Sequence, residues 1–464
     1  MQYISTRGTA PVLSFDEVLL TGLARDGGLY VPKSWPEFSK AEIASWKDFS
    51  YTELALEVMT PFVGDTLSRD ELSDIISDAY KNFESSDVVP LVKMGNEEWL
   101  MELFHGPTLA FKDIAMQFLG PLFDHVLTKR NQTICIAGAT SGDTGSAAIA
   151  ALRDHNNINV FILYPHGRIS PVQRRQMTTV VADNIHTIAL EGTFDDCQDA
   201  VKTLFNDIDF RDKHHLSAVN SINWARIMAQ AVYYFWAALK VGGPKRPVNF
   251  SVPTGNFGNV FAGYVAKRMG LPIAQFVVGS NSNDILTRFF ETGAMETTDV
   301  HPTISPSMDI QISSNFERLL FELLNRDGTR VAETFNSFRK TGYFAVPQNV
   351  LAEANKIFSG GRFNDDETRT MIGKAYTEKG ILIDPHTAIG LAAARKCRRN
   401  NTEPMVVLAT AHPAKFPESV ERASGSHPDL PEHLSDLMLR DEHINVLAND
   451  ITLLKSFIAK RVSV

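Results

Sequence analysis

The feature that most limits the possible folds of this sequence is a series of short apolar runs, each ending in a loop that leads into a helical pattern. The runs that read as strands cover residues 133–138, 160–164, 186–190, 248–252, 273–279 and 405–409. Between the third and fourth runs, apolar residues from Cys197 to Ile208 share one helical face, and Thr193 with Asp196 forms a capping signal. Strands that alternate with helices favour a parallel α/β architecture, whose ligands bind outside the strand carboxyl ends.

The length of 464 residues favours two or three domains that share a site, because a chain of this size outgrows a single core. Residues 1–90 are more helical, with a turn at Arg25–Gly28, and we predict that they form a separate N-terminal domain. Residues 91–425 form the predicted α/β region, with a large and a small subdomain. Residues 426–464 are predicted to be a helical extension that covers the core.

The charge balance limits the partners. A formal net charge of -9 repels phosphate backbones, so a ligand that carries phosphate needs a locally basic or amide-lined pocket. The basic cluster at Arg395, Lys396, Arg398 and Arg399 closes a predicted helix over residues 388–394, where cations favour the C-terminal carbonyls. Because no aromatic residues are interleaved with it, we expect no nucleic-acid partner.

Cysteine usage and hydropathy indicate the compartment. The chain has three cysteines and no C-x-x-C pair, which argues against a disulfide framework or a metal site and suits a reducing cytosol. The longest apolar stretch, residues 231–239, is far shorter than the roughly 20 residues that cross a bilayer. We therefore expect a cytoplasmic protein without a membrane partner, either a monomer or a weak homo-oligomer.

Lys112 is the first candidate for chemistry. It lies between bulky apolar residues in Phe104–Asp113, just before the helical run Ile114–Phe118. Apolar surroundings disfavour the ammonium, so the pKa falls and the amine becomes nucleophilic. The alternative is a lysine whose stem packs while its ammonium reaches solvent.

Two strand-to-helix loops are candidate anion sites. In Gly255-Asn256-Phe257-Gly258-Asn259, glycines allow a close approach of the backbone and the amides of the next helix point at the ligand, which suits phosphate, although such a loop can also be a simple turn. In the loop 139–146, hydroxyls and amides can hold a carboxylate or merely cap the helix. Thr410 ends the last predicted strand and faces the expected cleft, unless it is an ordinary strand-end residue.

Taken together, these motifs resemble the tryptophan-synthase-like, fold-type II family of pyridoxal-phosphate enzymes. The resemblance narrows to the threonine synthase family, in its longer bacterial and fungal branch. The motifs that carry it are Arg25–Pro32, Gly106–Asp113, Ala139–Gly145, Asn220–Arg226, Gly255–Asn259 and Ala409–Phe416. It implies an α/β fold with parallel or mixed sheets wrapped by helices, an N-terminal helical segment, and pyridoxal 5′-phosphate in the 91–425 region.

The resemblance also implies roles for the cofactor site. Lys112 would hold the cofactor as a Schiff base and later move protons. Residues Gly255, Asn256, Phe257, Gly258 and Asn259 would cradle its phosphate, and Thr410 would meet the pyridine nitrogen. Asp143 departs from the broader family, where asparagine commonly meets the phenolic oxygen, so a proton is needed on that oxygen or on the carboxylate.

The activity implied by the resemblance is that of a lyase acting on a phosphate ester: O-phospho-L-homoserine and water give L-threonine and phosphate, the last step of threonine biosynthesis. Ser141 and Thr144 are the candidates for the substrate carboxylate. Arg226 is the leading candidate for the substrate phosphate, with Asn223 and Lys415 behind it. Arg226 can equally be a structural ion-pair partner.

Two alternatives share these motifs. A phospholyase of the same fold would release 2-oxobutanoate and phosphate from the same substrate. A non-catalytic cofactor-binding protein would keep the fold without turnover, although an intact Lys112 argues against it.

Overall fold

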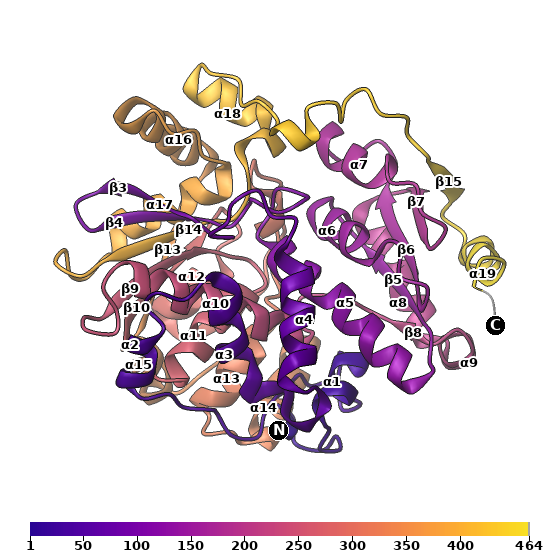
Figure 1. Cartoon of the computed structure of the whole chain (residues 1–464), viewed down its shortest axis with the longest axis horizontal. Coiled ribbons are helices and arrows are strands. Elements are labelled where there is room, and N and C mark those ends of the chain that lie inside the picture. Colours follow the sequence, from indigo (N-terminus) through magenta and orange to yellow (C-terminus); the bar gives the residue numbers. More distant parts are fainter. Residues whose placement is uncertain (463–464) are drawn as a thin grey trace.

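The computed structural model describes residues 1–462 and contains two main β-sheets. One sheet has six strands in the order β13-β10-β9-β14-β4-β3, all parallel except β3. The other has five parallel strands in the order β15-β7-β6-β5-β8. Figure 1 shows the six-stranded sheet on the left and the five-stranded sheet on the right, with α5 between them.

The strands are β1 (Tyr3–Ser5), β2 (Tyr30–Pro32), β3 (Leu91–Gly95), β4 (Glu98–Glu102), β5 (Ile134–Ala139), β6 (Ile158–Pro165), β7 (Ile185–Glu191), β8 (Leu216–Ser217), β9 (Val248–Pro253), β10 (Ile273–Ser280), β11 (Ala294–Glu296), β12 (Tyr343–Ala345), β13 (Phe358–Arg362), β14 (Met405–Ala409) and β15 (Asn445–Ala448). Short antiparallel pairs join β1 to β2 and β11 to β12.

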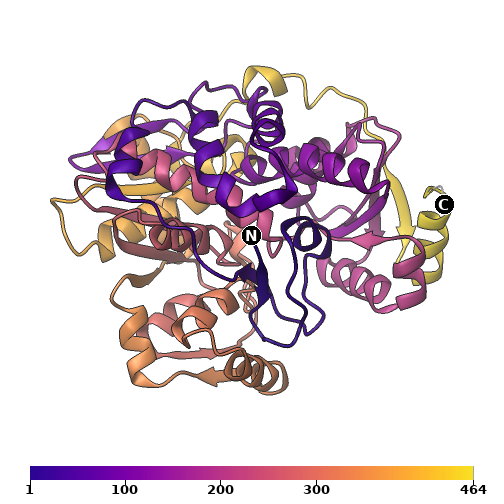
Figure 2. The same ribbon diagram turned by 60° about the horizontal axis from the view of Figure 1, so that its bottom comes forward.

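The helices are α1 (Phe15–Thr21), α2 (Lys40–Ser45), α3 (Tyr51–Val63), α4 (Arg69–Tyr80), α5 (Lys112–Arg130), α6 (Asp143–Leu152), α7 (Pro171–Thr178), α8 (Phe194–Asn206), α9 (Ile208–Lys213), α10 (Trp224–Lys240), α11 (Gly258–Arg268), α12 (Ile285–Thr292), α13 (Phe316–Leu323), α14 (Gly328–Thr341), α15 (Gln348–Ala354), α16 (Asp365–Lys379), α17 (Pro385–Cys397), α18 (Pro417–Ser424) and α19 (Ile451–Ala459). The 3₁₀ turns are η1 (Gly64–Thr66), η2 (Pro306–Met308), η3 (Pro413–Lys415) and η4 (Glu432–Leu434). In Figure 2, the orange segment that includes α13 and α14 projects from the lower side.

The predicted parallel α/β architecture is confirmed. Each of the six predicted runs lies in a strand, namely β5, β6, β7, β9, β10 and β14. The capping signal before α8 is also present, because the Thr193 hydroxyl accepts from the Asp196 amide while the Asp196 carboxylate accepts from the Thr193 amide. The remaining strands of the two main sheets were not predicted, since most are edge strands without a long apolar run.

A single buried helix, α10, organises the larger core. Its residues from Trp224 to Leu239 are all buried, and it packs against α3, α5 and α11. Because α10 is buried on all sides, it is apolar around its whole circumference. Across residues 1–462, no helix is long and apolar enough to cross a membrane.

The N-terminal segment is docked by buried polar contacts as well as by apolar packing. Arg7 donates to both carboxylate oxygens of Glu317 on α13, at 3.0 and 2.9 Å, and the Thr6 hydroxyl donates to the same group. Breaking such a buried pair would leave an uncompensated charge. Residues 1–90 contain the helices α1 to α4 and the short strands β1 and β2, and the domain limits at 90 and 425 stay a prediction.

The C-terminal region differs from the helical extension that was predicted. The chain leaves α18 beside the six-stranded sheet, crosses the molecule, and adds β15 in parallel to β7 before α19 (Figure 1). Strand β15 covers only Asn445–Ala448 and lies at the sheet edge, and so short a run carries little signal in the sequence.

The basic cluster at the end of α17 makes contacts within the fold. Arg395 pairs with Glu98 at 2.9 Å and with Glu378 at 3.3 Å. Arg399 donates to backbone carbonyls of residues 355, 356 and 358. The arginines of this cluster therefore bind groups of the protein itself.

Candidate active site

Lys112 is the first residue of α5 and is buried, with its Nζ 3.1 Å from the Asp143 carboxylate. Burial lowers the pKa of the Lys112 amine, Asp143 opposes that shift, and the nearby cations Lys415 and Arg226 add to it. The alternative of a lysine reaching solvent is therefore wrong. The lowered pKa has the direction that the apolar surroundings predict, and the nucleophilic role of the amine stays a prediction.

In the loop after β5, Thr140 accepts from the free amides before and at the start of α6, so the Asp143 side chain is left to contact Lys112. The Thr140 hydroxyl accepts from the amides of Gly142 and Gly145, both at 2.9 Å. The side chain of Asp143 is thus free of capping and points at the other site residues. Besides Lys112, it accepts from Gln173 Nε2 at 2.8 Å and from Ser307 Oγ at 3.1 Å, and it pairs with Lys415 at 3.0 Å.

The charge of Asp143 is decided by these neighbours. Burial would raise the pKa of its carboxyl, but Lys112 and Lys415, together with Gln173 and His386, hold that pKa well below its usual range. These neighbours therefore favour the ionised form of this carboxylate.

The two predicted carboxylate ligands flank Asp143. Ser141 is exposed and Thr144 is half-buried. Within residues 1–462, neither hydroxyl has a hydrogen-bond partner, so both are available to a ligand at the start of α6.

The glycine loop after β9 is built for close approach. A Cβ on Gly255 would lie 3.0 Å from Ile310 Cδ1 and 3.2 Å from Met308 Cα. Phe257 has a positive φ of 61°, which is uncommon for a bulky residue, and its buried ring packs against Phe316. Strain of this kind is concentrated at functional sites.

The loop also carries unused donors. In the described part of the chain, the amides of Gly255, Asn256, Gly258 and Asn259 donate to no other residue. The Asn259 side chain is buried and fixed, because its Oδ1 accepts from Tyr233 and Tyr234 at 2.6 and 2.9 Å, while its Nδ2 has no partner. A buried, orphaned donor beside free amides at a helix start fits a bound phosphate.

Thr410 follows β14 and is buried. Its backbone is fixed, since its amide donates to Thr387 Oγ1 at 3.2 Å and its carbonyl accepts from Phe111 at 2.9 Å. Among the described residues its hydroxyl bonds to nothing. The backbone contact places Thr410 beside Phe111, the residue that precedes Lys112.

Arg226 lies in the first turn of α10 and is only 3% exposed. It donates to the Val219 carbonyl at 3.2 Å, its Nε has no partner, and no carboxylate in residues 1–462 is paired with it. Burial lowers the pKa of this guanidinium to about 10, so it stays charged at neutral pH. The structural ion-pair alternative is not supported.

Two weaker substrate candidates have other contacts. Asn223 is fully buried and caps α10, because its Oδ1 accepts from the Ala225 amide while its Nδ2 donates to the Leu19 carbonyl. Lys415 is fully buried and bonds Asp143, Thr108 and Gln176. The structure therefore supports a substrate contact for neither residue.

Asn223→Ala is expected to lower the free energy of unfolding by about 2–3 kcal/mol, since it removes a cap and leaves the Leu19 carbonyl unsatisfied. The control is Asn364→Ala, which removes the exposed cap of α16 and should cost only about 1 kcal/mol. Denaturant unfolding measures both. Unchanged stability of Asn223→Ala together with a raised substrate KM would restore the ligand role.

Three site residues were missed from the sequence: Gln173 on α7, Ser307 in η2 and His386 on α17. Ser307 lies 164 residues from Asp143, which it bonds, so no local pattern marks it. His386 follows Asp384 and Pro385 at a helix start, where an Asp-Pro-His run was the available signal.

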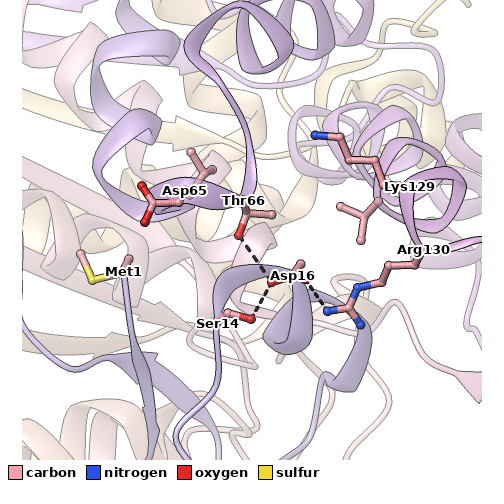
Figure 3. A pocket seen from close by; sticks show the side chains of 9 residues that line it. Met1, Ser14, Asp16, Asp65, Thr66, Lys129 and Arg130 are labelled. Atoms are coloured by element: carbon pink, nitrogen blue, oxygen red, sulfur yellow. Dashed lines mark hydrogen bonds and ion pairs between the residues drawn. The ribbon is translucent and has the colours of Figure 1, made fainter.

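One surface hollow lies away from this site. It is a space of about 360 Å³ between α1, η1 and the end of α5, lined by residues such as Asp16, Asp65 and Arg130 (Figure 3). Its charges are largely satisfied within the fold, because Asp16 pairs with Arg130 and Lys129 pairs with Glu71 at 2.7 Å. It shares no residue with the Lys112 site.

Comparison with known proteins agrees with this geometry. Residues 2–80 match the sequence family described as the threonine synthase N terminus, residues 88–335 match the pyridoxal-phosphate dependent enzyme family, and residues 387–458 match the threonine synthase C-terminal family. Threonine synthase of Pseudomonas aeruginosa is 54% identical over 99% of this chain and 98% of its own. The chain belongs to the threonine synthase family.

Solved members of the threonine synthase family share the fold. A PLP-bound threonine synthase from Brucella melitensis has a TM-score of 0.98 at 51% identity and covers 100% of both chains. Threonine synthase from yeast has a TM-score of 0.94 at 41% identity, covering 99% of this chain and 98% of its own. The predicted family, the fold-type II architecture and the pyridoxal-phosphate cofactor are thereby confirmed.

Proposed function

We propose that this chain converts O-phospho-L-homoserine and water to L-threonine and phosphate with pyridoxal 5′-phosphate, the last step of threonine biosynthesis. The observation that carries the proposal is the charge of the site: two buried lysines, Lys112 and Lys415, share one carboxylate, Asp143, and a third buried cation, Arg226, acts on Lys112 and has no carboxylate partner in residues 1–462. Such an excess of buried positive charge is costly without anions. A phosphorylated cofactor and a phosphorylated amino acid supply them.

The cofactor fits the residues on one side of the site. Lys112 would hold it covalently, the 255–259 loop with its orphaned Asn259 Nδ2 would bind its phosphate, and Thr410 would meet its ring nitrogen. When bound, pyridoxal phosphate supplies an electron sink for charge that develops at the substrate α-carbon. An ionised Asp143 would accept a hydrogen bond from the cofactor's phenolic oxygen, which would then carry the proton.

The substrate fits the other side. Ser141 and Thr144 would bind its carboxylate through free hydroxyls at the start of α6, a favourable position for an anion. Arg226 would bind its phosphate and stabilise the charge that grows as phosphate leaves. Lys112, released from the cofactor, would move protons among the substrate carbons, since it is buried and its pKa is already lowered.

The test is incubation of the purified protein with O-phospho-L-homoserine, with phosphate, threonine and 2-oxobutanoate all measured. We expect threonine and phosphate in equal amounts. A product dominated by 2-oxobutanoate would assign the phospholyase activity, and a bound cofactor without phosphate release would assign the non-catalytic alternative.

Asn259→Asp is expected to weaken cofactor binding by about 10- to 150-fold, the loss of roughly 1.5–3 kcal/mol, because it replaces the free donor with an acceptor facing phosphate. Fluorescence titration of cofactor-free protein measures this Kd. Asn401→Asp, on an exposed loop, controls for the added charge. An unchanged Kd in Asn259→Asp would contradict the phosphate role of this loop.

A further inference from the structure

Asp143 lies between two buried lysines that are held in different ways. Lys112 Nζ approaches its Oδ2 at 3.1 Å and makes no other hydrogen bond within residues 1–462. Lys415 Nζ approaches Oδ1 at 3.0 Å from the opposite sheet, on η3 after β14. Lys112 is therefore free to react, whereas Lys415 is positioned to remain paired with Asp143.

The contacts of Lys415 leave it nothing to offer a ligand. Its side chain is 0% exposed. Its ammonium donates hydrogen bonds to the Thr108 carbonyl at 2.7 Å and to Gln176 Oε1 at 3.1 Å, and it forms an ion pair with the Asp143 carboxylate at 3.0 Å. Gln176 is itself fixed, since its Nε2 donates to the same Thr108 carbonyl at 3.1 Å.

The other groups that face Asp143 do not supply a fixed positive charge. Gln173 and Ser307 donate as neutral groups. His386, which acts on Asp143 through space, binds Asp384 through Nδ1 at 2.6 Å, and its Nε2 accepts from the Ser307 amide at 3.3 Å. Among the described residues, the two groups that form an ion pair with Asp143 are Lys112 and Lys415.

We propose that Lys415 is the permanent counter-ion of Asp143, a positioning residue that keeps this carboxylate ionised and aligned while Lys112 is committed to the cofactor. The proposal rests on the proposed function only in assuming that Lys112 binds the cofactor covalently. A fully buried lysine held by these three contacts would not act as a second covalent attachment point, and its charge would stay in place while Lys112 reacts.

The physical need for such a residue follows from burial. A carboxyl removed from water and left without a cation has its pKa raised by up to about 3–5 units. Asp143 would then bind a proton near neutral pH as soon as the Lys112 ammonium was withdrawn. A protonated Asp143 could no longer accept a hydrogen bond from the cofactor's phenol at its protonated oxygen. The hydrogen bonds that it accepts from Gln173 and Ser307 would also be rearranged.

The test isolates Lys415 by first removing Lys112, without cofactor or substrate. Infrared difference spectroscopy of the full-length protein follows the C=O stretch of a protonated carboxyl against pH in Lys112→Met, Lys112→Met/Lys415→Met and Lys112→Met/Lys415→Gln. The glutamine variant keeps a donor for the Thr108 carbonyl while losing the charge, and it guards against a variant that fails to fold. Adding Asp143→Asn to each background assigns the band to Asp143.

We expect Asp143 to remain ionised at neutral pH in Lys112→Met and to become protonated when Lys415 is also replaced, with a midpoint raised by about 2–4 units. Lys112→Met/Gln176→Met is the matched control, since it removes a hydrogen-bond partner of Lys415 without changing charge. The same midpoint with and without Lys415 would overturn the proposal, as would an equal shift in the Gln176 control. Because no substrate is used, neither result bears on the proposed reaction.

Discussion

Replacing Lys112 with alanine is expected to lower kcat for threonine formation by on the order of 10⁴-fold, because this amine would serve as both the covalent attachment and the proton carrier. Its burial and lowered pKa suit both tasks. Steady-state phosphate release measures the loss, and borohydride reduction followed by peptide mapping should place the cofactor on Lys112 in the parent protein.

Lys267→Ala is the matched control for Lys112. Lys267 is also partly buried, burial lowers its pKa, and its Nζ donates to the Ile273 carbonyl at 2.6 Å outside the site. We expect its kcat to match that of the parent. A reduced cofactor adduct mapped to Lys415 would exchange the roles proposed for the two buried lysines.

Arg226→Lys is expected to lower kcat/KM for O-phospho-L-homoserine by about 10- to 1000-fold, the cost of roughly 1.4–4 kcal/mol, while the visible spectrum of the bound cofactor is retained. A guanidinium offers paired donors to a phosphate whose charge grows in the transition state, whereas an ammonium is a point charge. We also expect a larger 2-oxobutanoate fraction, because a loosely held intermediate lets water reach the wrong carbon.

Arg395→Lys controls for the Arg226 change. Arg395 pairs with Glu98 and Glu378 at the end of α17, and its replacement should leave kcat/KM at the parent value. Loss of cofactor or of folding in Arg226→Lys would show that its bond to the Val219 carbonyl matters more than any substrate contact. Parent-like kinetics would move the phosphate site elsewhere.

The sequence predicted what is encoded locally. Apolar runs between loops predicted the central strands. Apolar surroundings at a helix start made Lys112 a candidate, and the family resemblance implied its role. The same reasoning placed phosphate donors on the 255–259 loop, whose free amides and orphaned Asn259 Nδ2 agree with it. In each case the physical cause lies within about ten residues of the feature.

What could not be predicted depends on contacts across the fold. Lys415 was a weaker candidate for the substrate phosphate, and only the three-dimensional structure shows that it is buried against Asp143. Asn223 was also a substrate candidate, and its contact could not be predicted either, because the Leu19 carbonyl that accepts from its side-chain amide lies 204 residues away in sequence. The site residues that belong to tertiary pairs therefore needed the three-dimensional structure.

The crossing of the C-terminal segment has a consequence for synthesis on the ribosome. Strand β15 completes the five-stranded sheet from the far end of the chain, so β7 must wait with an open edge until residues 445–448 have been made. That edge is apolar, and Ile188 and Leu190 are buried in the finished molecule. A message cut short before this point would yield a protein with every proposed active-site residue and an unprotected strand edge, a template for aggregation.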